Sequence, residues 1–303
     1  MNFTEIRVRS RLKPEAVENL MAKIPTMKEH DVRLTGPTKV YTPEGKPLCI
    51  YLPGVVKEEM EAAYPVLTTI RAATENRGYA SGTAERVVQR NQRRGVPVTS
   101  SIIGAFEASG YYKFCRLTSW TSKELDERWP SLFPLFQAIA KQFATHIPDR
   151  YEAQMKFVRQ TPADWLVQET PFTTVTVNNS YATAAHRDVG DLDEGFSCLA
   201  VARKGEWEGG LLTFPEYRVA ADMQDGDMIL MDAHEVHCNT QMSCHCDNDW
   251  PKNVGHAGTG PCKTCGAERV SVVCYYRTKM ATCGTSQEEN AKALSWAEKI
   301  NAR

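Results

Sequence analysis

The chain has 303 residues, of which 42% are hydrophobic and 24% are charged, enough for a globular protein with one large core or two small ones. Its 36 basic residues nearly balance its 37 acidic ones, and the net charge of -1 excludes a surface that is basic overall and binds polyanions everywhere. No run approaches the roughly 18 apolar residues of a membrane span, and the charged start argues against a signal peptide, so we expect neither a membrane partner nor secretion.

Residues 1–160 are expected to form a mainly helical N-terminal part that packs on a core. Apolar residues recur with helical spacing in segments 13–24, 55–74 and 122–158, and three prolines must break the last segment into pieces. The run 76–95 lies between the second and third segments and is basic. We interpret it either as a segment that faces phosphates or as a solvated helix face; its arginines are Arg77, Arg86, Arg90, Arg93 and Arg94.

Residues 161–303 have the composition of a β-rich core. Five short runs, rich in β-branched and apolar residues, are separated by Gly and Asp, as is typical of two sheets that form a roll. We therefore predict an α+β fold with a double-stranded β-helix (jelly-roll, cupin-like) core flanked by helices, in one compact domain overall. Ser286 and Glu289 form a capping-box pair that begins a last helix, which ends near residue 300. The five runs are 172–179, 196–202, 209–214, 227–232 and 269–277.

Two histidines and one aspartate form a candidate metal site. His186 and Asp188 follow the first run and lie two residues apart, so in an extended segment both side chains point to the same side. His237 follows the fourth run, and two His with one carboxylate are the set that binds Fe(II) and leaves open positions. One alternative is a hydrogen-bonded pair beside a core histidine. Another is His234 in place of His237, since residues three apart on a strand face opposite sides.

An open iron site of this kind needs a co-substrate, and 2-oxoglutarate would chelate the metal while its far carboxylate requires a buried cation. Arg269 begins the last run, and Ser271 lies on the same face two residues later. A guanidinium binds a carboxylate through two hydrogen bonds and stays charged when buried. We therefore predict that Arg269 and Ser271 bind 2-oxoglutarate; a surface ion pair of Arg269 with Glu268 is the alternative.

The five runs and the residues between them resemble the catalytic core of the TET/JBP family of Fe(II)/2-oxoglutarate-dependent DNA 5-methylpyrimidine dioxygenases. The resemblance covers about 172–277 and rests on HRDVGDLDEGFSCLAV, GGLLTFPEYRVA, GDMILMDAHEVHCNT and RVSVVCYYR. It implies an enzyme that uses Fe(II), 2-oxoglutarate and O2 to hydroxylate the 5-methyl group of a base in DNA. His186, Asp188 and His237 would be its catalytic iron ligands, and Arg269 with Ser271 would hold 2-oxoglutarate.

Two positions that contact the base in animal members of the family differ here. An Asn and a His of those enzymes are replaced by Asp191 and Arg277, which can form hydrogen bonds with cytosine or with thymine. We favour 5-methylcytosine as substrate and 5-hydroxymethylcytosine as product, because HRD is the triplet of the TET branch. Thymine hydroxylation, as in the JBP branch, is the alternative. Arg187, the middle residue of the triplet, is a further candidate for DNA contact.

The methyl group of a base within duplex DNA cannot reach iron inside a roll, so the base must flip out into the pocket. Phe172, Tyr181 or Tyr217 could stack on the flipped base; the alternative is that these aromatic residues belong to the core. We expect a monomer whose partner is DNA that contains a 5-methylpyrimidine. We expect it in the cytoplasm, including the host cytoplasm if a virus encodes it, or in the nucleus if its source is eukaryotic.

The cysteine-rich insert 238–266 contains a second candidate metal site. Two pairs of cysteines, with one and two residues inside the pairs, are separated by fifteen residues, a spacing typical of a structural zinc ion held by thiolates. A flexible loop with free thiols is the alternative. The pairs are Cys244 with Cys246 and Cys262 with Cys265, and the substitute ligands are Cys238, His245 and His256.

Two other functions stay open. The first is the same oxygenase chemistry on a small molecule or a protein side chain, which DNA-stimulated succinate formation would separate from the DNA reaction. The second is a zinc-containing DNA-binding protein whose roll is catalytically silent, which an incomplete iron triad would indicate.

Overall fold

The computed structural model describes residues 1–25, 30–70, 99–108, 110, 112–246, 250 and 260–301. The basic run 76–95 and His256 lie outside the described residues, so the interpretation of that run stays a prediction. No helix in the described ranges has the length and apolar character that crossing a membrane requires.

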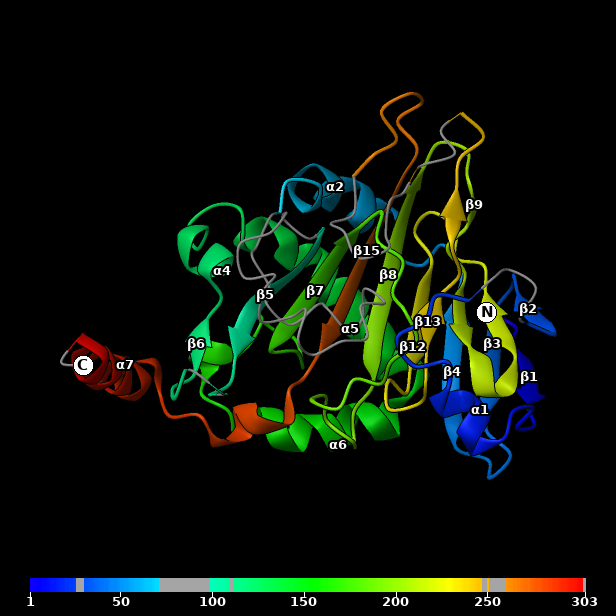
Figure 1. The fold of residues 1–303 in the computed structure, drawn as a ribbon. Helices are drawn as coiled ribbons and strands as arrows, with labels where there is room; N and C mark the ends of the chain where they lie inside the picture. Colours follow the sequence, from blue (N-terminus) through cyan, green and yellow to red (C-terminus); the bar gives the residue numbers. More distant parts are fainter. Residues whose placement is uncertain are drawn as a thin grey trace.

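A nine-stranded sheet forms the centre of the fold (Figure 1), with the strand order β1-β3-β4-β12-β8-β15-β7-β5-β6. Neighbouring strands run antiparallel except for β1 and β3, which are parallel. The strands are β1 (Thr4–Arg7), β3 (Thr38–Tyr41), β4 (Pro47–Leu52), β5 (Ser100–Phe106), β6 (Arg116–Leu117), β7 (Thr174–Asn179), β8 (Ser197–Lys204), β12 (Met228–Met231) and β15 (Glu268–Tyr275).

A smaller sheet, in the order β13-β10-β11-β2, faces the nine-stranded one and shares a hydrophobic core with it. Two facing sheets of this kind form a double-stranded β-helix, so the predicted fold class is confirmed. A two-stranded sheet of β9 and β14 completes the β structure. These strands are β2 (Val32–Leu34), β9 (Glu208–Gly209), β10 (Leu212–Phe214), β11 (Val219–Ala221), β13 (Cys238–Asn239) and β14 (Met242–Ser243).

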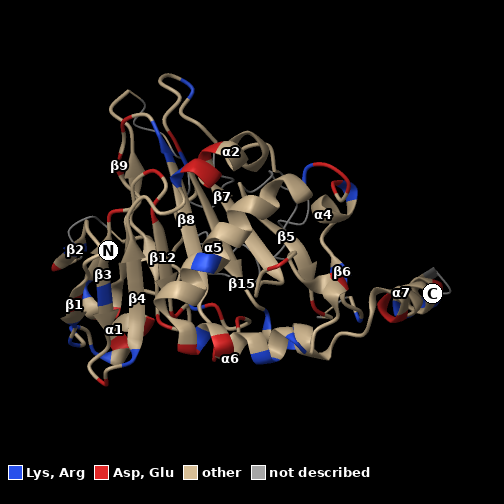
Figure 2. Cartoon of the chain, turned by 180° about the vertical axis from the view of Figure 1, so that it is seen from behind, with Lys and Arg blue, Asp and Glu red and all other residues tan. Residues whose placement is uncertain are grey.

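Helices cover the other face of the nine-stranded sheet, where α2 (Lys57–Leu67) and α5 (Phe133–His146) cross its back (Figure 2). The period-two alternation of β15 explains this layering. Val270, Val272 and Cys274 pack into the core under the helices, while the residues between them point the other way, toward the smaller sheet.

The three prolines of segment 122–158 act as predicted, because each one begins a new piece of helix. The pieces are η2 (Pro130–Leu132), α5 with a proline in its first turn, and α6 (Pro148–Val158). The remaining short helices are α1 (Pro14–Glu18), α4 (Ser119–Lys123), η3 (Ala163–Trp165), η4 (Pro215–Tyr217) and η5 (Thr278–Thr282).

Six strands in residues 1–160 were not predicted, and five of them extend the nine-stranded sheet. Two physical reasons account for the omission. β1, β2, β3 and β6 have at most four residues, too few for a period to show. β4 and β5 are buried almost throughout, so their sequences lack the alternation of a half-exposed strand.

The last helix, α7 (Ser286–Asn301), is where it was predicted, but its cap is one residue earlier than expected. The backbone N–H of Thr285 donates to the carboxylate of Glu288, and the Glu288 N–H lies 3.4 Å from the Thr285 hydroxyl. Glu289 instead accepts a hydrogen bond from the N–H of Cys115. A disulfide between Cys115 and Cys283 ties the chain before α7 to the end of the sheet.

Candidate metal centre

His186, Asp188 and His237 come together although 51 positions separate the two histidines. The backbone N–H of each histidine donates to the carbonyl of the other at 3.0 Å, so a β-bridge places the two imidazoles side by side. Each Nε2 lies 3.6 Å from one carboxylate oxygen of Asp188. One ligand atom from each residue lies within 4.8 Å of the others. This is the spacing at which three side chains can share one ion.

Both imidazoles are oriented for coordination through Nε2. Nδ1 of His186 donates to the carbonyl of Ala184 at 2.7 Å, and Nδ1 of His237 donates to the carbonyl of Glu235 at 3.0 Å. Such contacts fix the tautomer that leaves the Nε2 lone pair free for a metal. Burial and the neighbouring His186 lower the pKa of His237 to about 4, so its neutral, ligating form predominates at pH 7. The donor set therefore fits the iron of a facial triad.

The three residues border a cavity of about 410 Å³ between the two sheets. Its lining includes Ser271, Val273 and Tyr275 from the inner face of β15 and Leu212 from the facing sheet. A volume of this size is in the range of small-molecule and cofactor sites.

Arg269 lies at the start of β15, on the same strand face as Ser271, and only 2% of its surface is exposed. Its Nη2 has no hydrogen-bond partner among the described residues. Burial and the nearby Arg203 lower the pKa of Arg269 to about 10, which still leaves it charged at neutral pH. A buried, charged guanidinium with an unused donor fits the far carboxylate of 2-oxoglutarate. The amide of Asn178 lies 3.4 Å from the Ser271 hydroxyl on the same cavity wall.

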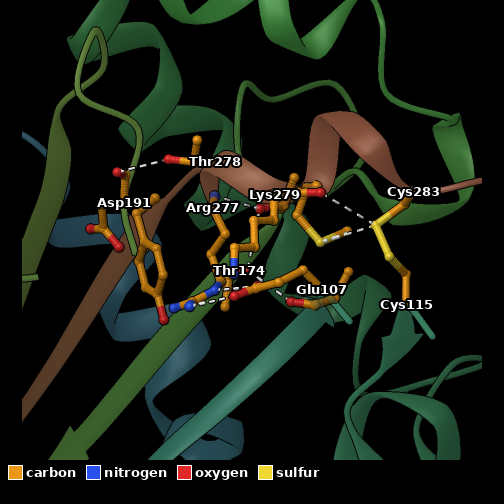
Figure 3. Close-up of polar contacts among 12 residues, drawn as sticks. Glu107, Cys115, Thr174, Asp191, Arg277, Thr278, Lys279 and Cys283 are labelled. Atoms are coloured by element: carbon orange, nitrogen blue, oxygen red, sulfur yellow. Dashed lines mark hydrogen bonds and ion pairs between the residues drawn. A yellow bond between two sulfur atoms is a disulfide. The ribbon is translucent and has the colours of Figure 1, made fainter. Parts of the chain in front are cut away.

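Asp191 and Arg277 also line the cavity, and they form a β-bridge with each other (Figure 3). The guanidinium of Arg277 donates to both carboxylate oxygens of Glu107, and it stacks 4.4 Å from the centre of the Phe106 ring. Although burial opposes it, the contact with Glu107 raises the pKa of Arg277. Sequence reasoning missed Glu107, and at 170 positions from Arg277 no local signal could have revealed it.

Asp191 is held on several sides. Its Oδ2 accepts a hydrogen bond from the Ser197 hydroxyl at 2.7 Å, and its carbonyl accepts one from Thr278 (Figure 3). Burial and the neighbouring Asp188 raise the pKa of Asp191 well above its ordinary value. The two predicted base-contact residues are thus brought together on the cavity wall.

Arg187 and His234 lie apart from the three clustered ligand atoms. The guanidinium of Arg187 donates to Glu18 of α1 at 2.8 Å, at the rim of the cavity. His234 forms ion pairs with Asp232 at 3.1 Å and Asp193 at 2.9 Å, and the hydrogen bond with Asp232 raises the pKa of His234 to about 9. His234 is therefore paired with carboxylates, and His237 is the histidine that clusters with His186 and Asp188.

The three aromatic residues named as stacking candidates are core residues, which was the alternative interpretation of them. Phe172 packs parallel to Phe143 beneath the sheet, Tyr217 belongs to the core between the sheets, and Tyr181 is 1% exposed. None of them lines the cavity. The aromatic side chains that do line it are Phe106 and Tyr275.

The four predicted thiolate residues also come together, at the end of the molecule where β14 stops and β15 starts. Their sulfur atoms all lie within 4.8 Å of one another. Cys238, a substitute ligand, is buried in β13 and contacts Thr213, and His245 forms an ion pair with Glu208. The cluster consists of Cys244, Cys246, Cys262 and Cys265.

Comparison with known proteins shows the family to which the chain belongs. A family model named Tet_JBP, the oxygenase domain of the 2OGFeDO superfamily, matches residues 107–278. The thymine dioxygenase JBP1 of Leishmania braziliensis is 33% identical over 166 residues, which are 54% of this chain and 18% of that protein. JBP1-A of Trypanosoma cruzi (strain CL Brener), also named a thymine dioxygenase, is 30% identical over 256 residues, 84% of this chain and 27% of that protein.

The matched regions thus span about a fifth to a quarter of these relatives. Among solved structures, NgTET1 in complex with 5mC DNA has a TM-score of 0.58 and 13% identity, over 95% of this chain and all of that one. At this identity the likeness concerns the fold.

A double-stranded β-helix with a His-Asp-His donor set and a buried, unsatisfied arginine defines the class of 2-oxoglutarate-dependent dioxygenases. The chain belongs to the Tet_JBP family of oxygenase domains. The expected enzyme class and the expected family are therefore both confirmed. The cofactors of the superfamily are Fe(II), 2-oxoglutarate and O2.

Proposed function

We propose that this protein hydroxylates the 5-methyl group of a pyrimidine base in DNA. The observation that carries the proposal is one cavity bordered by His186, Asp188 and His237 and by the hydrogen-bonding side chains of Asp191 and Arg277. The buried guanidinium of Arg269 lies on β15, the strand that supplies Ser271 to the wall of this cavity. In this proposal His186, Asp188 and His237 are the catalytic iron ligands. Bound there, iron and 2-oxoglutarate supply the oxidation of a C–H bond by O2.

The residues of β15 orient the co-substrate. Arg269 binds the far carboxylate of 2-oxoglutarate through its unused donor, and the Ser271 hydroxyl adds a second contact two residues along the same face. Because Arg269 is buried, the contact excludes water and the charge interaction is stronger than at a surface.

The methyl group reaches the cavity when the base flips out of the duplex. The carboxyl group of Asp191 and the guanidinium of Arg277 then contact the polar edge of the base. Glu107 holds Arg277 in place from the side, so the direction of its remaining donors is determined before the base arrives. Phe106 and Tyr275 replace the predicted aromatic residues as candidates to contact the base ring.

Thymine is the base that we favour. Relatives at 30% and 33% identity are named thymine dioxygenases. The ring N–H of thymine is a donor for which Asp191 offers an acceptor. The argument for 5-methylcytosine came from the HRD triplet, and its middle residue, Arg187, forms an ion pair with Glu18. 5-Methylcytosine stays the second candidate, because the Asp191 carboxylate also fits its amino group.

We also propose that the chain acts as one compact domain and as a monomer on DNA, in the cytoplasm or, in a eukaryote, the nucleus. The core beneath the helices combines side chains from both parts of the sequence, such as Leu135 and Phe136 with Leu230 and Val272. Such a shared core supports a single folding unit rather than two.

Mass spectrometry of nucleosides tests the function. One DNA contains thymine and unmethylated cytosine. A second contains 5-methylcytosine, and its thymine is replaced by uracil. A third, with uracil and unmethylated cytosine, is the control. Each is incubated with the protein, Fe(II), 2-oxoglutarate and O2, and Asp188→Ala is the matched inactive variant.

5-Hydroxymethyluracil from the first DNA alone is the expected result. 5-Hydroxymethylcytosine from the second DNA alone would replace thymine by 5-methylcytosine. Unchanged bases in both, with succinate still formed, would overturn the assignment of DNA as substrate.

A further inference from the structure

We propose that Cys244, Cys246, Cys262 and Cys265 bind one structural zinc ion, and that this ion fixes the start of strand β15, where Arg269 lies. The metal site is separate from the iron site and does not depend on the proposed function. The effect of the zinc ion on 2-oxoglutarate binding does rest on the proposed function, so zinc content and 2-oxoglutarate binding are measured in separate experiments.

The distances between the sulfur atoms are close to those of a zinc tetrathiolate. Sγ of Cys244 lies 3.2 Å from Sγ of Cys246 and 3.4 Å from Sγ of Cys265, and Cys246 lies 3.6 Å from Cys262. Four sulfurs bonded to one zinc at about 2.3 Å lie about 3.8 Å from each other at the corners of a tetrahedron. The thiols are therefore close enough to share one ion, and none of the four is joined in a disulfide.

The turn 262–266 has the backbone arrangement that a metal-binding knuckle needs. The N–H of Gly266 donates to the carbonyl of Cys262, and the N–H of Cys262 donates to the carbonyl of Ala267, both at 2.8 Å. Gly266 has a φ of +72°, in the left-handed region that glycine adopts at least cost. This tight turn brings Cys262 and Cys265 onto the same side, toward the other two thiols.

An apolar cluster backs the four thiols on one side. Cys244 and Cys262 are buried in it with Trp207, Trp250 and Met242, whereas the other two cysteines are exposed. The Trp250 indole N–H donates to the carbonyl of Gly260 at 2.8 Å. A site with one dry and one open side shields the thiolates while a metal can still enter from solvent.

The cluster lies where two segments of the chain, the end of β14 and the approach to β15, come together. On one side, β14 pairs with β9 over just two residues, and a Cβ at Gly209 would lie 1.8 Å from the carbonyl oxygen of Gln241. On the other side, only three residues separate Cys265 from Arg269. A metal ion bound by all four thiolates would therefore restrain the residues between Cys265 and Arg269. This would fix the start of β15, so that the Arg269 guanidinium keeps the position it needs to bind a carboxylate.

Metal analysis of protein purified without chelators, after expression with zinc sulfate in the medium, tests the site directly. We expect about one zinc per chain, in addition to any iron. Cys262→Ser should lower zinc at least about fivefold, because the remaining three thiolates leave the tetrahedron incomplete. His245→Ala is the matched control: it stands between two of the cysteines, is exposed, and should keep the zinc.

Wild-type protein gives a second test that does not depend on a variant folding. A mercurial thiol reagent should release the zinc to a chromogenic chelator as the cluster thiols react. Replacing zinc by Co(II) should give the visible absorption of a tetrahedral thiolate site. Protein that holds no zinc and shows freely reacting cluster thiols would overturn the proposal, as would iron in this site or loss of zinc in His245→Ala.

The effect on the strand is read from 2-oxoglutarate binding, which rests on the proposed function. Cys262→Ser should weaken 2-oxoglutarate binding about tenfold, while His245→Ala leaves it unchanged. Zinc loss without any change in binding would keep the metal site but overturn its positioning role.

Discussion

Strand β15 has an arginine at each end, and the two are buried in different ways. Arg269 begins the strand with an Nη2 donor that has no partner among the described residues, and burial lowers its pKa to about 10. Arg277 follows the strand and has both oxygens of Glu107 as partners, and that contact raises its pKa. The guanidinium at the start of the strand thus lacks a carboxylate partner, and the one after its end has a carboxylate partner.

The difference indicates that the two guanidinium groups have different roles: one can bind an anionic ligand, and the other has its N–H donors already oriented. A buried guanidinium without a carboxylate is costly, and a ligand that supplies the carboxylate recovers that cost. A guanidinium already paired inside the protein gains little charge energy from a ligand, but its remaining N–H donors have a defined direction. Arg269 is therefore suited to bind an anionic co-substrate, and Arg277 to contact a neutral base.

Arg269→Gln should give the largest change. The variant loses the charge that a carboxylate needs, so 2-oxoglutarate binding should weaken about 1,000-fold, or about 4 kcal/mol. The ligand-free protein should unfold at the same temperature or higher, because a buried unpaired charge is removed. Calorimetric titration with 2-oxoglutarate and thermal melting measure the two effects.

Arg203→Gln is the control for Arg269, because Arg203 lies opposite it on β8 but pairs with Asp222. It should leave 2-oxoglutarate binding within about threefold. Equal weakening in both variants would mean that general charge, rather than the unused donor of Arg269, attracts the co-substrate.

Glu107→Gln should leave Arg277, whose side chain is 18% exposed, without its carboxylate partner. We expect a loss of about 3 kcal/mol of stability, measured by urea unfolding, because one partner of a buried pair is removed. The double variant with Arg277→Gln should recover most of this loss. Additive losses in the double variant would show that the pair is not coupled. Glu152→Gln, in a surface ion pair, should change stability by less than about 0.5 kcal/mol.

His234 should make stability depend on pH. Its pKa is raised to about 9 in the folded protein, above an unfolded value of about 6.5. Its contribution is therefore complete below pH 6.5 and lost as the pH rises through 9. After allowance for its partial exposure, we expect wild-type protein to lose about 1–2 kcal/mol more than His234→Gln over this interval. If urea unfolding showed the same loss of unfolding free energy in both proteins between pH 6.5 and 9, this prediction would be contradicted.

Arg187→Ala should have the smallest effect. Its ion pair with Glu18 is largely exposed, so the free energy of unfolding should change by less than about 0.5 kcal/mol. If Arg187 does not select the base, the ratio of thymine to 5-methylcytosine hydroxylation should also be unchanged. A shift of this ratio by more than about threefold would restore the argument from the HRD triplet.

The sequence predicted the parts of the site that depend on strand periodicity. His186 with Asp188, and Arg269 with Ser271, share faces because residues two apart on an extended chain do so. Glu107 could not be predicted in this way, since its contact with Arg277 exists only after β5 and β15 join one sheet with β7 between them. The stacking candidates could not be told from core residues for a related reason: an aromatic residue in a sequence gives no sign of which side of a sheet it covers.

The β-rich half of the fold was predicted better than the helical half. The runs that became β7, β8, β12 and β15 are rich in apolar and β-branched residues and contrast with the glycines and aspartates between them. The strands of residues 1–160 are either too short or too fully buried to show a period, so their place at the sheet edges and centre depends on tertiary pairing.

The most direct test of the account is the stoichiometry of the reaction on DNA. With Fe(II), 2-oxoglutarate, O2 and DNA that contains a 5-methylpyrimidine, wild-type protein should form about one succinate for each base hydroxylated, and Asp188→Ala should form neither product. Succinate that forms without oxidation of any base, or hydroxylated bases that still form in Asp188→Ala, would contradict the claim that this cavity joins the iron site to a DNA base.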